Sequence, residues 1–196
     1  MHRLLAAALL VAATCAHGAL LFRAPQESAR RFAQRHAPGA VIVHRVLETD
    51  AWGVRHAIIA FQRVESREGE RRIEGVLYLP RRPGEYRRIE IDTYPPEGGA
   101  PRIESAFFAD AGAERRRVLV VLVAWPQAHA DVRGMLHGVF VYDRPQDDLD
   151  ETRLPPDRET GKRLEAGCDC TYRDGRQTHA RYKSAEAVRA ALKELR

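Results

Sequence analysis

Strand-length hydrophobic stretches recur along the middle of this 196-residue chain, and turn-forming residues separate one stretch from the next. Some stretches alternate between apolar and polar residues, whereas residues 54–62 are apolar on both faces, which is typical of a central strand. Strands this frequent, separated by glycine, proline and charged turns, indicate an antiparallel sheet. We therefore expect about six or seven antiparallel strands, at residues 40–47, 54–62, 72–79, 86–94, 103–109, 117–125 and 135–143.

A helical pattern precedes this region and another follows it. Residues 25–37 begin with Pro25, which suits a first helical position, and Pro38-Gly39 ends the pattern. Residues 184–196 form the second pattern, in which Ser184 is the expected N-cap. Its apolar stripe consists of Val188, Ala191, Leu192 and Leu195.

The segment between the sheet and the second helix has no hydrophobic period and contains three prolines. We interpret residues 144–183 as a Pro-rich connection with a Cys-x-Cys turn, partly helical between Pro156 and Leu164. The expected fold is α+β, with an N-terminal helix and an antiparallel sheet in residues 19–143 and a C-terminal helix packed on that sheet. Residues 19–196 are enough for one domain with its own core, and no internal repeat divides them.

The first eighteen residues predict where the protein works. Arg3 supplies a short positive region, residues 4–13 are an unbroken apolar run, and small residues stand at Ala16 and Gly18. This is the pattern of a cleaved signal peptide, so we expect the mature chain to begin near Ala19 in the periplasm or outside the cell. An alternative places a lipid anchor on Cys15, after Ala12-Ala13-Thr14.

Charge and hydropathy limit the classes of partner. The formal net charge is +5 and both signs are mixed along the chain, which does not predict a nucleic-acid surface. Beyond the leader no apolar stretch is long enough to span a membrane. Arginine clusters at residues 71–72, 81–82, 87–88 and 115–117 could bind an anionic envelope polymer if they shared one face. Interleaved glutamates favour local pairing instead, so the expected partner is an envelope protein or an anionic polymer.

Two cysteines remain after the leader, Cys168 and Cys170. In an oxidising compartment an even count favours a disulfide, although two residues of a straight strand are near the upper limit for a bridge. A bend at Gly167 or Asp169 would help. Free thiols and a zinc site that includes His179 remain open, but zinc needs four ligands and one histidine is near. No metal or cofactor is predicted.

Residues 107–123 run from Phe107-Phe108 through Asp110 and Gly112 into an apolar strand. This order of aromatic strand end, acidic loop and apolar strand resembles the repeat units of FG-GAP and VCBS-type proteins. In that family the loop holds calcium through several oxygen ligands. The resemblance implies that Asp110 stands at the first ligand position, but Gly112 replaces a second acidic ligand and Glu114 is a poor third. We therefore expect a degenerate unit without bound calcium.

Aromatic and polar residues gather between the last two expected strands. Trp125, His129 and Asp131 are candidates for ligand binding, since they converge near one strand end. A structural interpretation is that Trp125 covers the core of the sheet while Asp131 shapes a turn. Two histidines and two carboxylates could also form an acid–base or metal-assisted site. The candidate catalytic residues are Asp110, His129, Asp131 and His137.

No His-Glu-x-x-His pattern and no Gly-x-Ser-x-Gly pattern is present in the chain. We therefore expect an exported, non-catalytic binding or scaffolding protein. The first alternative is a metal-assisted or acid–base hydrolase that uses the four residues above. The second is a thiol-redox accessory that uses Cys168 and Cys170.

Overall fold

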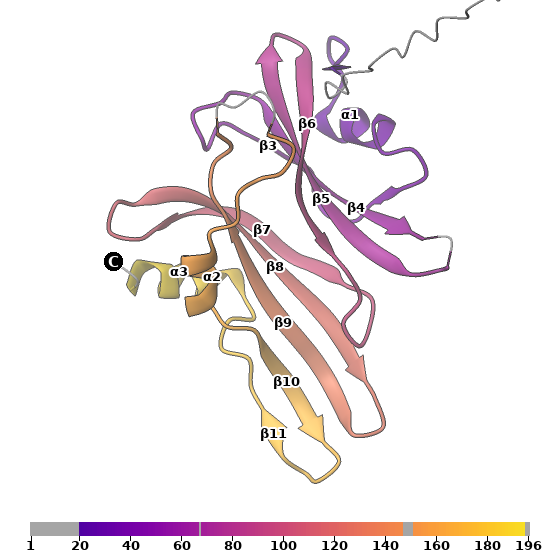
Figure 1. Cartoon of the computed structure of the whole chain (residues 1–196), viewed down its shortest axis with the longest axis vertical. Coiled ribbons are helices and arrows are strands. Elements are labelled where there is room, and N and C mark those ends of the chain that lie inside the picture. Colours follow the sequence, from indigo (N-terminus) through magenta and orange to yellow (C-terminus); the bar gives the residue numbers. More distant parts are fainter. Residues whose placement is uncertain (1–19, 67, 147–150, 195–196) are drawn as a thin grey trace, which may run out of the picture.

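The computed structural model describes residues 20–66, 68–146 and 151–194, and in them the chain forms two antiparallel sheets (Figure 1). Sheet A contains β1 (Leu21–Phe22), β2 (Val41–Ile42), β3 (Leu47–Thr49), β4 (Ala57–Glu65), β5 (Arg71–Arg82) and β6 (Glu85–Tyr94). Its strand order is β1-β6-β5-β4-β2, and β3 also pairs with β4. Sheet B contains β7 (Arg102–Ala111), β8 (Arg116–Ala128), β9 (Val132–Tyr142), β10 (Gly167–Tyr172) and β11 (Gln177–Thr178). Its order is β11-β10-β9-β8-β7.

The sheet-rich α+β class is confirmed, but the expectation of one sheet is wrong. Residues 95–101 do not return the chain beside β6. They carry it across to the second sheet, where β7 pairs with β8 instead. Local alternation of apolar and polar residues is the same in either arrangement, because it reports one buried face and not the identity of the neighbouring strand.

The two sheets bury their inner faces against each other. Sheet A contributes fully buried Phe61, Leu77 and Ile91, and sheet B contributes Leu119 and Val121. Each such side chain stabilises the fold by roughly 1.5–3 kcal/mol relative to exposure. The alternate residues of the central strands point outward and are buried as well, so both sheets need a cover on their outer faces.

The helices supply these covers, on opposite sides of the molecule (Figure 1). Helix α1 (Ala29–Arg35) places Phe32 against the outer face of sheet A, with Ser28 as its N-cap. Helix α3 (Ala185–Glu194) places Val188 and Leu192 on the outer face of sheet B. The helix placement therefore differs from the prediction of a C-terminal helix on one sheet: α3 covers the outer face of sheet B, α1 covers that of sheet A, and α1 is shorter than the predicted 25–37. Leu195, the last residue of the predicted stripe, lies outside the described residues.

The Pro-rich connection has more structure than a tether. Residues 152–157, here called the strap, first follow the edge of β6, where Glu90 N–H donates to Thr152 O at 2.8 Å and Leu154 N–H to Glu90 O at 2.7 Å. The strap then reaches the edge of β9, where Asp157 N–H donates to Val141 O at 2.8 Å. Helix α2 (Arg158–Arg163) follows directly. The strap therefore joins the two sheets along one side of the sandwich.

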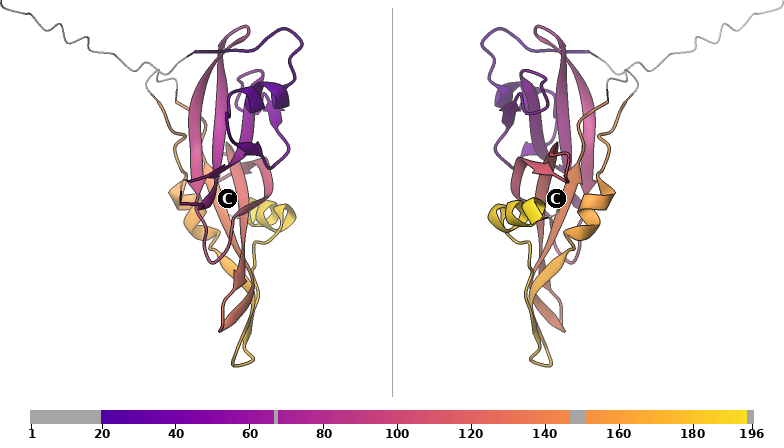
Figure 2. Two further views of the ribbon diagram at one scale, coloured as in Figure 1. Left: turned by 90° about the vertical axis from the view of Figure 1, so that its right-hand side faces the viewer. Right: turned by 90° about the vertical axis from the view of Figure 1, so that its left-hand side faces the viewer.

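Sheet B extends beyond sheet A, and its strands alone form the narrow end of the molecule in Figure 2. The connection 95–101 lies against this region, because the indole N–H of Trp125 donates to Pro95 O at 2.8 Å and the Gln127 amide to Glu97 O at 2.6 Å. Within the described residues no helix has the length and hydrophobicity of a membrane span.

Candidate functional site

A β-bulge in β6 changes which residues face the interior. Gly75 pairs with Asp92, but Val76 pairs with Glu90, so Ile91 is an extra residue on the β6 side. Simple alternation along a strand would place Thr93 on the same face as Ile89 and Ile91. After the bulge, Tyr94 enters the core instead. Bulges of this kind re-aim side chains, and they are frequent beside functional sites.

Three polar side chains form a chain of hydrogen bonds between the sheets. Tyr94 on β6 and Tyr142 on β9 bring their hydroxyl oxygens to 3.0 Å, and the Tyr142 hydroxyl donates to Asp92 Oδ2 at 2.8 Å. Both tyrosines are about 1% exposed, and burial raises the pKa of each hydroxyl far above its ordinary value. Arg153 of the strap forms an ion pair with Asp92 and lies 3.6 Å from Glu90. The carboxylate of Asp92 is therefore tied to both sheets and to the strap.

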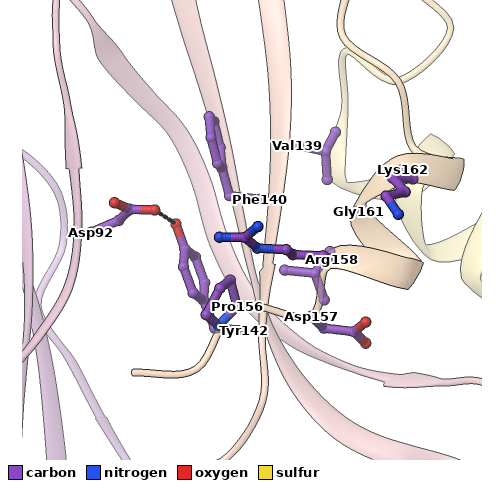
Figure 3. Close-up of a pocket in the computed structure, with 10 residues that line it drawn as sticks. Asp92, Val139, Phe140, Tyr142, Pro156, Asp157, Arg158, Gly161 and Lys162 are labelled. Carbon is purple, nitrogen blue, oxygen red and sulfur yellow. Dashed lines mark hydrogen bonds between the residues drawn. The ribbon is translucent and has the colours of Figure 1, made fainter. Parts of the chain in front are cut away.

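A pocket of about 270 Å³ opens beside this chain, between β9, the strap and α2 (Figure 3). Most of its wall is apolar, and four of its ten lining residues come from β9. We call it the α2 pocket, and its lining residues are Asp92, Val139, Phe140, Val141, Tyr142, Pro156, Asp157, Arg158, Gly161 and Lys162. Concave, mostly apolar sites with a few polar groups are typical of small-molecule binding.

Arg158 is the cation that faces the α2 pocket. In Figure 3 its side chain extends from α2 across the pocket toward Tyr142 and Asp92. Among the described residues its guanidinium has no hydrogen-bond or ion-pair partner, whereas Lys162 pairs with Glu159 at 3.1 Å. Asp157 is held on the far side: it caps α2 through Thr160 and accepts from Arg116 at 2.8 Å.

A second pocket of about 610 Å³ lies beside Pro155 of the strap, near Trp52, Arg116, Arg117 and Arg144. Its cations are mostly neutralised, because Arg116 pairs with Asp143 and Asp157, and Arg117 pairs with Asp110. The Trp52 indole N–H already donates to Arg117 O at 2.8 Å. Because Arg144 and Gln146 adjoin residues 147–150, which lie outside the described residues, we base no site on this pocket.

The structure does not bring the four candidate catalytic residues together. Asp110 lies near the end of β7, where it pairs with Arg115 at 3.0 Å and Arg117 at 3.1 Å. These hydrogen bonds lower the pKa of its carboxyl group. His129 follows the opposite end of β8. The intervening strand, from Arg117 to Ala128, spans about 36 Å at ~3.3 Å per residue.

The same geometry bears on the acidic loop of residues 107–123. The strand, turn and strand are present as β7, a turn and β8, but the Asp110 carboxylate is occupied by two arginines. Among the described residues no group of three or more His, Cys, Asp or Glu side chains could hold a metal ion. The relationship to the calcium-binding repeats stays an expectation.

The candidate ligand residues separate as well. Trp125 is 3% exposed and belongs to the inter-sheet core, as in its structural interpretation. His129 and Asp131 share an exposed turn, which His129 N–H closes onto Val132 O at 2.9 Å. His137 is on β9, paired with Gly167 of β10, and its half-buried position lowers its pKa. These residues do not line either pocket described above.

Cys168 and Cys170 form a disulfide within β10, with Cα atoms 5.2 Å apart. Gly134 of β9 lies opposite Cys170. A Cβ at Gly134 would come within 2.1 Å of Asp169 O and 2.9 Å of Cys170 Sγ, so only glycine fits there. His179 is exposed and lies 3.8 Å from Asp169, so with both sulfur atoms paired the zinc alternative has no thiolate ligand. The thiol-redox hypothesis stays a prediction.

The arginine clusters are spread over β5, β6 and the start of β8. Arg71-Arg72 and Arg81-Arg82 stand at opposite ends of the twelve-residue strand β5. Arg72 and Arg88 both pair with Glu74, at 3.0 and 3.8 Å, which agrees with local neutralisation by the interleaved glutamates. Binding of an anionic polymer stays a prediction.

The sequence interpretation missed every polar residue of the α2 pocket. Asp92 and Tyr142 are fifty positions apart and meet through sheet packing, which no local pattern indicates. One signal was available: Asp157 with Thr160 three residues later, after two prolines, is a helix N-terminus pattern. It would have placed Arg158 in the first turn of a helix.

Comparison with known proteins identifies no relative, because no family model, no curated protein and no solved structure matches the chain.

Proposed function

We propose that this chain is an exported, periplasmic binding protein whose small-molecule ligand occupies the α2 pocket. The observation that carries the proposal is the pocket itself: a mostly apolar cavity of about 270 Å³ faced by Arg158, whose guanidinium has no partner in the part of the chain that the structure describes. At ~30 Å³ per water molecule, this volume corresponds to about nine waters, enough for a ligand of roughly eight to ten non-hydrogen atoms.

Rigid surroundings favour binding by this pocket. Its floor is β9, which pairs with β8 over ten residues, and its rim is fixed by the strap and by the Asp157 cap of α2. A pocket held in shape before the ligand arrives loses less conformational entropy on binding. The hydrolase alternative has no comparable support, because Asp110 lies at the opposite end of β8 from His129 and Asp131.

Three probes with one six-carbon chain and different head groups test the pocket: hexanoate, 1-hexanol and hexylamine. We expect at least one probe to shift the amide NMR signals of Val139, Phe140 and Gly161 in the unmodified chain. A Cβ at Gly161 meets nothing within 4 Å, so Gly161→Phe can fill the pocket mouth without a backbone clash. This variant should abolish the shifts, whereas Gly161→Ala, which adds one methyl group, should retain most of the binding. Binding by none of the three probes, or unchanged binding in Gly161→Phe, would contradict the proposal.

Export is tested separately, by mass spectrometry of the protein recovered from a bacterial host after cell fractionation. We expect a periplasmic chain that begins at Ala19, as the leader pattern of residues 1–18 predicts. A diacylated Cys15 at the N-terminus would replace the cleaved form with a lipid-anchored one. An intact leader on protein inside the cell would contradict export.

A further inference from the structure

We infer that the ligand of the α2 pocket is a small monocarboxylate with an apolar body, whose carboxylate pairs with Arg158. This inference rests on the proposed function and adds the chemical class of the ligand.

The carboxylates at the pocket are already satisfied. Asp92 accepts from the Tyr142 hydroxyl and the Thr93 N–H, both at 2.8 Å, and it pairs with Arg153. Asp157 accepts from Thr160 N–H at 3.0 Å, from its hydroxyl at 2.6 Å and from Arg116. In Figure 3 the Asp157 carboxylate points away from Arg158. A cationic ligand would therefore have to displace protein donors.

The hydrogen-bonding capacity that is left unused at the pocket belongs to a donor, the guanidinium of Arg158. Arg158 carries five N–H groups in a planar fork, and none of them has a partner among the described residues. Such a fork matches the two oxygens of a carboxylate. Lys162 stands one helical turn further along α2 at the same pocket, and its charge adds to the attraction for an anion even though it pairs with Glu159.

The remaining wall favours an apolar body. Val139, Phe140, Val141 and Pro156 form its apolar part. A ligand that is charged throughout would leave this surface without a partner, whereas a short aliphatic or aromatic group would cover it. The limited volume excludes a long acyl chain, so the class is a short-chain or single-ring carboxylic acid.

The three probes of equal chain length separate this inference from the proposed function. Because a charge-assisted pair is stronger than a neutral hydrogen bond, hexanoate should bind the full chain at least about tenfold more tightly than 1-hexanol or hexylamine. Since Arg158 is exposed to solvent, this preference should weaken as salt is raised. The measurement is the dissociation constant from amide shifts of Val139 and Phe140.

Arg158→Met keeps most of the aliphatic stem and removes the charge. We expect it to reduce the preference for hexanoate over 1-hexanol to about threefold or less. Arg163→Met is the matched control: it makes the same change on the same helix, outside the pocket lining, and should leave the preference unchanged. Thermal unfolding of both variants verifies that α2 remains folded.

The outcomes are distinct. If 1-hexanol binds as tightly as hexanoate, or if Arg158→Met retains the preference, the inferred ligand class is wrong while the pocket stands. If hexylamine binds most tightly, Asp92 and not Arg158 selects the ligand, and the inference is again overturned. If no probe binds, the proposed function fails with it.

Discussion

Three buried tyrosines show how the environment of one hydroxyl group determines its contribution to stability. The Tyr142 hydroxyl links Tyr94 to Asp92, and the Tyr94 hydroxyl has Tyr142 as its partner. The hydroxyl of Tyr78, on the outer side of sheet A, has no hydrogen-bond partner among the described residues although the residue is fully buried. A buried polar group without a partner costs free energy, whereas a satisfied one contributes.

Replacement of each tyrosine by phenylalanine should therefore give three different results. Tyr142→Phe should lower the free energy of unfolding by about 1–3 kcal/mol, because it leaves both Tyr94 and Asp92 with an unmade bond. Tyr94→Phe should cost about 0.5–1.5 kcal/mol, and Tyr78→Phe should be neutral or stabilising. Urea unfolding of the three variants measures these differences. A loss in Tyr78→Phe equal to that in Tyr142→Phe would contradict the assignment.

At the scale of elements, α2 depends on contacts outside itself. A helix of six residues is too short to be stable alone, so its position comes from the cap and from the strap that precedes it. Asp157 provides both connections, since it caps α2 through Thr160 and pairs with Arg116 of β8. Burial raises the pKa of Asp157, but the hydrogen bonds from Thr160 and Arg116 outweigh it and lower the pKa below 3.8.

We expect Asp157→Ala to destabilise the protein by about 0.5–2 kcal/mol through loss of the cap. Asp157→Asn keeps a capping oxygen and loses the charge. It therefore isolates the pH-dependent part of the contribution that Asp157 makes to the free energy of unfolding. Because the folded state holds fewer protons than the unfolded state as pH falls below about 4, this part of the stability is present at neutral pH and lost in acid. Urea unfolding at pH 6 and pH 3 should therefore show a smaller acid loss in Asp157→Asn than in the unmodified chain. An equal loss would show that another group causes it.

The elements also show what the sequence could predict. Alternation predicted the centre of β5 and a continuous apolar run predicted that of β8, but both strands extend further, because the ladder continues through polar residues such as Arg82 and Gln127. The stretch 40–47 was expected as one strand, but it contains only the short β2 and the first residue of β3. The α2 pocket could not be predicted, since Asp92 reaches it through a bulge and Tyr142 through the packing of two sheets.

At the scale of the whole molecule, three histidines in different layers bind a proton more weakly in the folded chain than in the unfolded chain. His36 packs against Phe32 of α1, His44 against Phe61 of the core, and His137 lies on β9. Burial lowers the pKa of each imidazole below 6.5. In the unfolded chain the same groups take up protons nearer pH 6.5.

The unfolded state therefore binds more protons as the pH falls below about 6.5, and acidification favours it. We expect the free energy of unfolding to decrease between pH 7.5 and pH 5, with a slope that His137→Asn reduces. Urea unfolding across this range measures the slope. Constant or increasing stability toward pH 5 would contradict the burial of these histidines in their neutral form.

The division of the chain between the two sheets has a consequence for biosynthesis. Sheet A uses residues 21–94 and sheet B uses residues 102–178, so each half forms its hairpins from nearby segments. Because a polypeptide is synthesised from its amino end, sheet A can form before the residues of sheet B have been made. Phe61, Leu77 and Ile91 then face water until the later half arrives. During that interval a chaperone that binds the exposed apolar surface of nascent chains would bind the inner face of sheet A.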